Sequence, residues 1–485
     1  MYDFRPVLAV LARVIIVFSF AFVVPALWAW AEDESHRGLW VSTGAFTAFS
    51  GVVLMLLTQS YRRELRTKDG LMLVNLVWLV LPAFAAVPLH LSIPGATWVT
   101  AYFEAMSGLT ATGATAFSGL DDLPLSVNIW RCFLQLFGGL GIMLLVVAIL
   151  PLLGLGGLQV YKAETPGPMK DDKLTPRVAE TARGLWGVYV TLSVGCLLAY
   201  RWAGMSWADA FMHMNTTVSL GGFSSKDASL GHWDSLAIEG VAMVFMLLAG
   251  VSFARYFIVW RLRSLRPMWR DVEVRYYVVI LAIAVLLMTA VLWVHDVVDD
   301  PWLALRHSAF QVLSLATTTG YASVDYGVWP VVAPVLLVFL GCFVSCAGST
   351  GGGIKMVRMV LLVKQARREL VRTIHPRVVN PVTLGGVATP NGVLQTVLAF
   401  MLIYGASIVL LSFVMLLSGA DIVTAFSAVV ACVNNIGPGL AEVGPASNFG
   451  VLSDFQIWVL SFAMLLGRLE MLSVLVLLTR QFWLR

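Results

Sequence analysis

The chain has 485 residues, of which 59% are hydrophobic and only 12% are charged. Soluble domains carry about 25% charged residues, so this composition excludes an ordinary soluble protein. The formal net charge is only +4, and the composition predicts a polytopic membrane protein.

Ten apolar runs have about the 20 residues that a helix needs to cross roughly 30 Å of hydrocarbon. The first run has Arg5 before it and Ala29-Trp30-Ala31 near its end, as a signal peptide would, but it exceeds the roughly 7–15 apolar residues of such a peptide. In chain order the runs cover residues 7–30, 40–58, 71–92, 125–150, 184–203, 235–260, 276–297, 330–347 with a continuation at 354–363, 394–417 and 453–479.

Basic residues gather in alternate loops, at 59–70, 159–183, 261–275 and 355–377. The positive-inside rule predicts that these loops, and with them both termini, are cytoplasmic. Orientation in the bilayer explains the basic loops without any nucleic-acid partner. The intervening segments are expected outside and contain Asp121, Asp122, Asp227, Asp234, Asp299, Asp300, Asp325 and Glu442.

Four times, a short and partly polar segment between two apolar runs ends at a glycine. The four glycines are separated by 109, 98 and 117 residues. Each follows about 12 amphiphilic residues, too few to span a bilayer, so we predict half-helices that enter from outside and return as extended backbone. The half-helices are expected at 99–111, 206–219, 302–317 and 421–434, and the dipeptides that follow them are Thr112-Gly113, Gly221-Gly222, Thr319-Gly320 and Ile436-Gly437.

This arrangement favours a pathway for a cation. Each half-helix would direct its partly negative C-terminal end toward the axis. Backbone carbonyls can replace the hydration shell of a cation, and glycine leaves the opening free of side chains. The alternative, that the glycines only serve turns or helix packing, would require the same coincidence in four equivalent places.

The expected fold is therefore an all-α integral membrane protein with four helix–pore-loop–helix repeats around a central pore. A two-helix hairpin at residues 1–68 precedes the repeats. The repeats are expected at 69–158, 159–265, 266–378 and 379–485.

A glycine-rich stretch interrupts the apolar run of the third repeat. It lacks the Gly-Lys-Ser/Thr sequence of a phosphate-binding loop, because Gly353 is followed by Ile354-Lys355-Met356. Each glycine lowers helix propensity by about 1 kcal/mol relative to alanine. The stretch therefore predicts a movable gate below the four glycines of the pore, with a packing kink as the alternative. The stretch consists of Gly348, Ser349, Thr350, Gly351, Gly352 and Gly353.

Arg468 lies inside the last apolar run, where a charge is costly and usually functional. The five cysteines and seven histidines show no disulfide framework or metal-ligand spacing. No catalytic constellation or cofactor fingerprint is present either, so we expect a protein that is not an enzyme and has a transported ion rather than a bound cofactor.

Several motifs resemble the potassium-uptake subunits of bacterial Trk systems, the TrkH branch of the Trk/Ktr/HKT superfamily. The resemblance extends over essentially the whole chain, including the leading hairpin. The motifs are Phe137-Gly138-Gly139-Leu140-Gly141, Tyr161-Lys162-Ala163-Glu164, Lys173-Leu174-Thr175-Pro176-Arg177, residues 346–355, Asn434-Asn435-Ile436-Gly437-Pro438-Gly439 and Gly467-Arg468-Leu469-Glu470.

The resemblance implies that Gly113, Gly222, Gly320 and Gly437 occupy the selectivity-filter positions of a potassium pathway. The second and fourth loops depart from the Thr-x-Gly pattern, as is usual in that family. The resemblance also implies that residues 348–353 obstruct the pore from the cytoplasmic side. It implies too that Arg468 projects into the pore, where it could repel cations or pair with the glycine-rich stretch. It further implies a bacterial inner-membrane homodimer regulated by a cytosolic TrkA-like ring of nucleotide-binding RCK domains.

Three other classes are less consistent with the sequence. A sodium transporter with alternating access usually has two inverted halves, whereas these four repeats are parallel. A membrane enzyme would gather acidic or histidine residues at one face, and a receptor or scaffold would not need four half-helices. Coupling of uptake to protons or sodium, as in a symporter, stays open at this stage.

Overall fold

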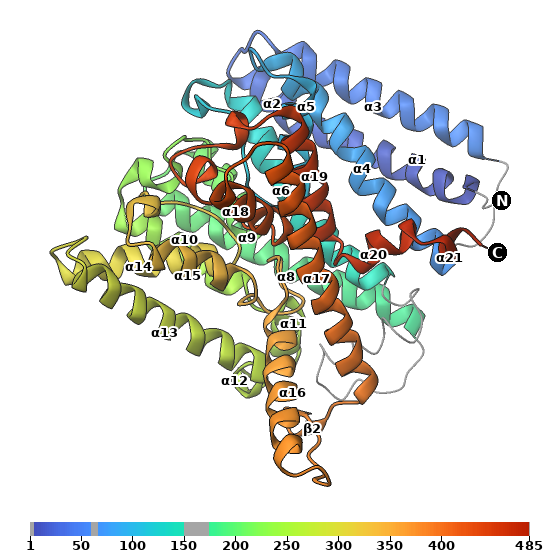
Figure 1. Cartoon of the computed structure of the whole chain (residues 1–485). Helices are drawn as coiled ribbons and strands as arrows, with labels where there is room; N and C mark the ends of the chain where they lie inside the picture. Colours follow the sequence, from blue (N-terminus) through green and yellow to red (C-terminus); the bar gives the residue numbers. More distant parts are fainter. Residues whose placement is uncertain (1–3, 60–65, 150–173, 485) are drawn as a thin grey trace.

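The computed structural model describes residues 4–59, 66–149 and 174–484. Residues 60–65 and 150–173, which include much of two expected basic loops and the motif 161–164, lie outside the described residues. Regular structure in the described part is almost entirely helical (Figure 1). The strands described there, β1 (Thr383–Leu384) and β2 (Val387–Ala388), form one short antiparallel hairpin.

The chain begins with the predicted two-helix hairpin. Helices α1 (Arg5–Ser19) and α2 (Val23–Ala31) join through a 3-10 turn into one apolar rod of 27 residues, and α3 (Arg37–Thr58) returns beside it. In the described residues, five helices are long and apolar enough to cross a membrane, and two further pairs would each make one bent span.

Four units of outer helix, short helix and inner helix follow, as the sequence predicts. In the first and second units, the short helices are α5 (Trp98–Leu109) and α9 (Trp207–Val218), and in the third and fourth they are α14 (Pro301–Ala316) and α18 (Ile422–Val433). The outer helices are α4 (Thr67–Ser92), α8 (Leu174–Trp202), α13 (Val272–Val294) and α17 (Asn391–Leu417). The inner helices are α6 (Leu125–Ile149), α10 (Leu236–Ala249) with α11 (Phe253–Leu262), α15 (Val332–Gly341) with α16 (Met356–Ile374), and α19 (Asp454–Arg468) with α20 (Leu472–Leu475); α12 (Arg266–Arg270) links the second and third units and α21 (Arg480–Trp483) ends the chain.

Each short helix begins at a side chain that accepts a hydrogen bond from a first-turn amide. Such caps satisfy amides that have no partner within the helix, so they fix where the helix starts. The first two caps are Thr97, bonded to the Thr100 amide at 3.1 Å, and Ser206, bonded to the Asp209 amide at 3.0 Å. The other two are Asp300 and Asp421, which accept from the amides of Trp302 and Val423 at 3.0 and 2.9 Å.

The units pack into a closed ring. Each inner helix contacts the short helix of its own unit and also the short helix of the next unit, through the pairs α6 with α9, α10 with α14 and α15 with α18. Helix α19 of the fourth unit packs on α5 of the first and completes the circle. The four short helices therefore converge on one centre.

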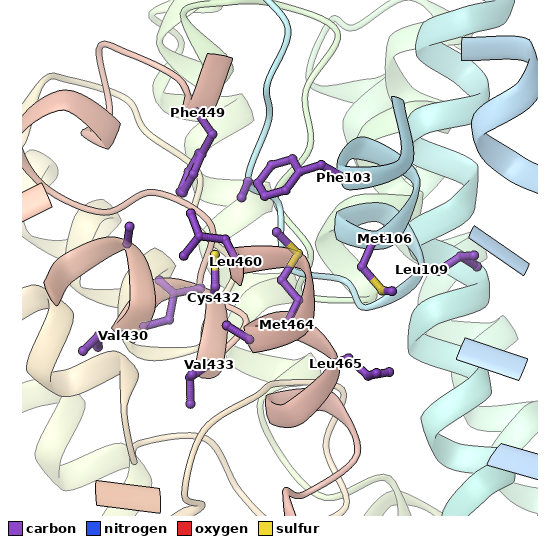
Figure 2. Close-up of a cluster of buried hydrophobic side chains, with 14 of the residues drawn as sticks. Phe103, Met106, Leu109, Val430, Cys432, Val433, Phe449, Leu460, Met464 and Leu465 are labelled. Carbon is purple, nitrogen blue, oxygen red and sulfur yellow. The ribbon is translucent and has the colours of Figure 1, made fainter. Parts of the chain in front are cut away.

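Buried apolar side chains fill the closing junction between the fourth and first units (Figure 2). Phe103 and Met106 of α5 face Leu460 and Met464 of α19, and Cys432 of α18 lies beside them. All five are at most 1% exposed. This packing holds the first and last units together although they are far apart in the sequence.

The inner helix of the third unit differs from the prediction. The break extends from Cys342 to Lys355, well beyond the six glycine-rich residues. The helix resumes in α16, where the apolar continuation at 354–363 was expected, and extends beyond it through basic residues to Ile374. Helix α16 forms because Val357, Val360 and Leu361 bury one face, a spacing that suits a helix.

The hairpin depends on a close approach of α1 and α3 at Gly51. A Cβ atom at this position would lie 2.7 Å from Ile16 Cγ1 and 3.1 Å from the carbonyl oxygen of Ala12. Small residues allow helices in a membrane to approach in this way. At its tip, the hairpin attaches to α6, since the Glu34 carboxylate accepts from the Ser126 amide at 3.0 Å.

Replacing Gly51 with valine should lower the melting temperature of the detergent-purified protein, because the added atoms must push α3 away from α1. Overpacking of this kind costs about 1–3 kcal/mol. Gly38→Val is the matched control, because Gly38 lies in the same helix with nothing within 4 Å of its added Cβ. Equal melting temperatures for the two variants would contradict the close packing.

Candidate functional site

The four glycine segments share one backbone conformation. In each, the residue two positions before the glycine is left-handed, with φ of 49° at Ala111, 54° at Leu220, 64° at Thr318 and 53° at Asn435. The next amide donates to a carbonyl five residues back, at 2.8–2.9 Å, in all four units. The glycines follow with φ of 85°, 75°, 83° and 102°, at Gly113, Gly222, Gly320 and Gly437.

The four segments meet in a ring of glycines and carbonyls. A Cβ atom on Gly113 would clash with the carbonyl oxygen of Gly221, and one on Gly222 would clash with that of Thr319. A Cβ on Gly320 would likewise meet the Ile436 carbonyl oxygen, and one on Gly437 would lie 2.9 Å from the Thr112 carbonyl oxygen. The structure therefore brings together all eight predicted filter residues, in the order of the units around the ring.

Each unit supports its segment from behind with a polar side chain of the short helix. Glu104, His213 and Gln311 each lie nine residues before the glycine of their unit. His213 Nε2 is 3.0 Å from Ser224 Oγ, and Gln311 Nε2 donates to the Val324 carbonyl at 3.2 Å. In the fourth unit Ser427 takes this role, since its hydroxyl accepts from the Leu440 amide at 2.9 Å. The backbone geometry is thus fourfold, while the side chains behind it differ.

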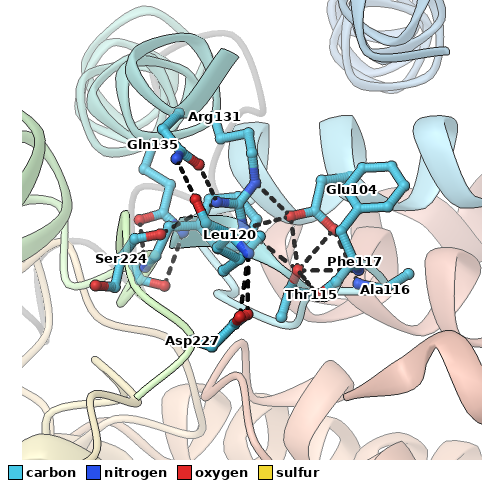
Figure 3. A network of polar contacts seen from close by, with 12 residues as sticks. Glu104, Thr115, Ala116, Phe117, Leu120, Arg131, Gln135, Ser224 and Asp227 are labelled. Carbon is cyan, nitrogen blue, oxygen red and sulfur yellow. Dashed lines mark hydrogen bonds and ion pairs between the residues drawn. The ribbon is translucent and has the colours of Figure 1, made fainter. Parts of the chain in front are cut away.

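The polar contacts behind the glycine segment of the first unit include a buried ion pair (Figure 3). Glu104 and Arg131 approach to 2.7 Å, and both side chains are fully buried. The carboxylate also accepts from Thr115 Oγ1 and from the Ala116 amide, both at 2.9 Å. Arg131 Nη1 donates to the Ser224 carbonyl of the second unit at 3.1 Å. The pair therefore ties the segments of the first and second units to each other.

Gln135 provides a second link between the same two units. Its Nε2 donates to the Gly221 carbonyl at 2.8 Å, and its Oε1 accepts from the Phe223 amide at 3.1 Å. One side chain thereby brackets Gly222 on both sides. It fixes the direction of a carbonyl that belongs to the glycine ring.

A cavity of about 80 Å³ adjoins the ring, and Gly113, Gly222 and Gly320 form part of its lining. At its rim, Asp121 pairs with Lys226 at 3.1 Å. Partial burial acts to raise the pKa of Asp121, but hydrogen bonds from the Asp227 amide and from Lys226 outweigh it and hold the pKa below its usual range. Asp121 is therefore a carboxylate at neutral pH.

The glycine-rich stretch lies against the inner side of the ring. Thr350 Oγ1 donates to the Val218 carbonyl at 3.0 Å, and the Gly352 amide donates to Thr318 Oγ1 at 2.8 Å. A Cβ atom on Gly352 would clash with the carbonyl oxygen of Asn434. The stretch thus contacts the ends of the short helices of the second, third and fourth units.

Arg468 joins this stretch to the first unit. Its Nη1 donates to the Thr350 carbonyl at 3.0 Å, and its Nη2 donates to the Gly138 carbonyl of α6 at 2.7 Å. The side chain is 1% exposed, and its Nε has no hydrogen-bond partner among the described residues. The predicted gating residues, 348–353 and Arg468, therefore come together directly below the glycine ring.

Contacts with α11, α13 and the end of α19 hold the two ends of the break between α15 and α16. Glu273 of α13 accepts from the amides of Ala347 and Val357, at 2.7 and 3.1 Å. Phe253, the first residue of α11, donates its amide to the Gly348 carbonyl at 3.0 Å. Arg358 pairs with Glu470 at 2.7 Å, which connects α16 to the end of α19.

Glu104, Arg131 and Gln135 were not among the site residues predicted from the sequence. A signal was available, because Arg131 is a charge inside an apolar run and Glu104 is a charge inside a predicted half-helix. An unpaired charge inside a membrane has a high free energy, so the presence of one acidic and one basic residue predicts that they form an ion pair. No cluster of three metal-binding side chains occurs in the parts of the chain that the structure covers.

Breaking the ion pair from one side should destabilise the protein more than removing both charges. Removing one partner of a buried pair costs about 3–5 kcal/mol, because the other charge stays buried and uncompensated. We expect lower melting temperatures for Glu104→Gln and for Arg131→Met than for the double variant. Exposed Glu442→Gln serves as the control, and a double variant less stable than both single variants would contradict the expectation.

Comparison with known proteins agrees with this architecture. Residues 37–483 match the family model of TrkH, described as a cation transport protein. The chain is 43% identical to the Trk system potassium uptake protein TrkH of Halomonas elongata and 40% identical to that of Escherichia coli K12, with 99% of both chains covered in each case. The crystal structure of the potassium transporter TrkH from Vibrio parahaemolyticus superposes with a TM-score of 0.92 at 38% identity, covering 100% of both chains. The chain is thus a transport protein rather than an enzyme, and it belongs to the TrkH family of cation transport proteins.

Proposed function

We propose that this protein takes up potassium across the bacterial inner membrane through a selectivity filter made by its four units. The observation that carries the proposal is the closed ring in which each glycine faces a backbone carbonyl of the next unit. Carbonyl oxygens can replace the water around a cation without the full charge that would trap it. The names of the relatives identify potassium as the ion that those proteins take up.

The filter comprises Thr112, Gly113, Gly221, Gly222, Thr319, Gly320, Ile436 and Gly437. The short helices favour a cation there, because their partly negative C-terminal ends converge on the ring. Glycine in all four positions is consistent with the potassium-selective members that the sequence resembles. The four repeats correspond to residues 69–158, 159–265, 266–378 and 379–485.

Residues 348–353 and Arg468 form the gate of the proposed pathway. Thr350 and Gly352 bond to Val218 and Thr318, at the ends of the short helices that lead into the ring, so an ion leaving the filter would meet this segment next. The charge of Arg468 adds electrostatic repulsion, because the structure shows carbonyl partners for it and no carboxylate among the described residues. Opening requires these hydrogen bonds to break.

Regulation would come from a cytosolic ring of TrkA-like nucleotide-binding domains that docks on basic cytoplasmic segments. Helix α16 offers such a surface, because it carries Lys364, Arg367 and Arg372 and follows directly after the gate. We further propose a homodimer with both termini in the cytoplasm. Membrane potential drives uptake in this proposal.

The filter assignment predicts a graded response to glycine substitution in rubidium uptake by proteoliposomes. Gly113→Ser and Gly320→Ser should lower uptake about tenfold or more and remove the preference for potassium over sodium as competitor. The added side chain must displace the neighbouring carbonyl group, at a cost of about 1–3 kcal/mol. Gly437→Ser should lower uptake least of the three, because a Cβ atom there would lie 2.9 Å from its nearest carbonyl oxygen, whereas one at Gly113 or Gly320 would lie much closer to its own.

Gly119→Ser is the matched control for this series. Gly119 also has a positive φ of 71°, but nothing lies within 4 Å of its added Cβ. The control therefore reports the cost of the backbone conformation without any clash in the ring. Equal sodium competition in all variants, including the unmodified protein, would show that these glycines do not select the ion.

The gate assignment predicts that Arg468→Gln raises rubidium uptake measured without a cytosolic partner. The variant weakens two hydrogen bonds from a charged group, each worth about 1.5–3 kcal/mol, so we expect an increase of about tenfold or more. Arg480→Gln, an exposed position on α21, should leave uptake unchanged. Unchanged uptake in Arg468→Gln would mean that this arginine does not hold the gate closed.

A further inference from the structure

The segment from Trp260 to Arg270, which contains the end of α11 and all of α12, has an unusual surface. Large apolar side chains stand out from it, with Trp260 68%, Trp269 65%, and Leu262 and Leu265 both 61% exposed. Exposed arginines alternate with them along the chain. These are Arg261, Arg263, Arg266 and Arg270, and Arg275 follows on the next helix.

The position of this segment is that of a membrane interface. Helix α11 leaves α10 at an angle of 85°, and α12 ends one residue before α13, an apolar helix long enough to span the membrane. Asp271 lies between them and caps α13 by accepting from the Val274 amide at 3.0 Å. The segment therefore adjoins the end of a span, which on the proposed orientation is the cytoplasmic end.

The arginines of the segment are available for an external anion. The guanidinium groups of Arg261, Arg263, Arg266 and Arg270 make no hydrogen bond or ion pair with residues 4–59, 66–149 or 174–484. The two nearest acidic residues in the sequence are already occupied. Asp271 pairs with Arg255, and Glu273 accepts from the amides of Ala347 and Val357.

We propose that Trp260–Arg270 is a binding surface for anionic phospholipid headgroups of the inner leaflet. Tryptophan prefers the boundary between headgroups and acyl chains, while each arginine near an anionic membrane contributes about 1 kcal/mol of attraction. The alternation of the two residue types matches a lipid surface, which presents phosphate and hydrocarbon side by side. A folded protein partner would leave four such apolar side chains in contact with water whenever it dissociated.

This surface is connected to the glycine-rich segment below the ring. Helix α11 begins at Phe253, whose amide donates to the Gly348 carbonyl at 3.0 Å. Arg255 on the same helix pairs with Asp271, and so fixes α11 to the start of α13. Lipid bound at the far end of α11 would therefore hold a helix that contacts the proposed gate.

Native mass spectrometry of the delipidated full-length protein can test the proposal by titration with phosphatidylglycerol or phosphatidylcholine. We expect the unmodified protein to bind phosphatidylglycerol in preference. In the triple variant Arg263→Gln/Arg266→Gln/Arg270→Gln, the ratio of phosphatidylglycerol to phosphatidylcholine affinity should fall roughly a hundredfold, because each arginine contributes about 1 kcal/mol. The matched control Arg263→Lys/Arg266→Lys/Arg270→Lys keeps the charge and should keep most of the preference.

Three results would overturn the proposal. The first is equal retention of phosphatidylglycerol by the glutamine variant and the unmodified protein. The second is a glutamine variant that binds lipid as the unmodified protein does but shifts from dimer to monomer mass, which would make the surface an interface between two copies. The third is unchanged lipid binding with loss of an added cytosolic ring protein, which would make it a protein-docking surface. Rubidium uptake is not the readout, so a failure here is separate from a failure of the proposed filter.

Discussion

The structure depends on the close approach of four backbone segments at the centre of the ring. Each glycine faces a carbonyl oxygen of the following unit, and in none of the four contacts could a methyl group be added without a shift of the neighbouring atoms. Such closeness requires helices that start and stop at defined residues. The four capped short helices provide this, and the inner helices fix their positions by packing against two short helices at once.

Buried charges serve two different purposes around this ring. Glu104 neutralises Arg131, and the pair acts as a support that holds two filter segments in register. Arg468 has carbonyl oxygens as partners, so its positive charge stays uncompensated among the described residues. Burying an unpaired charge has a high free-energy cost. In the proposed gate, this uncompensated charge of Arg468 below the ring repels cations.

The supports behind the ring are unequal although the ring itself is nearly fourfold. The first and second units share an ion pair and a bracketing glutamine, whereas the fourth unit is held by the Ser427 hydroxyl and by a hydrogen bond from Asn435 Nδ2 to Thr112 Oγ1 of the first unit at 2.9 Å. The fourth glycine also has the most room, at 2.9 Å from its nearest carbonyl oxygen. Stiffness should therefore differ around the ring, with the junction of the first and second units held most firmly.

The membrane class, the leading hairpin, the four short helices and the glycines that follow them could all be predicted from the sequence. These features depend on local composition, run length and periodicity, which the chain displays directly. It could not show that Gly113 faces Gly221 or that Arg468 bonds to Gly138, because those contacts join residues of different units. Nor did it reveal that Arg131 serves the second unit as well as its own. These pairings arise only when four units that are far apart in the chain pack around one axis, so they become visible only in the folded protein.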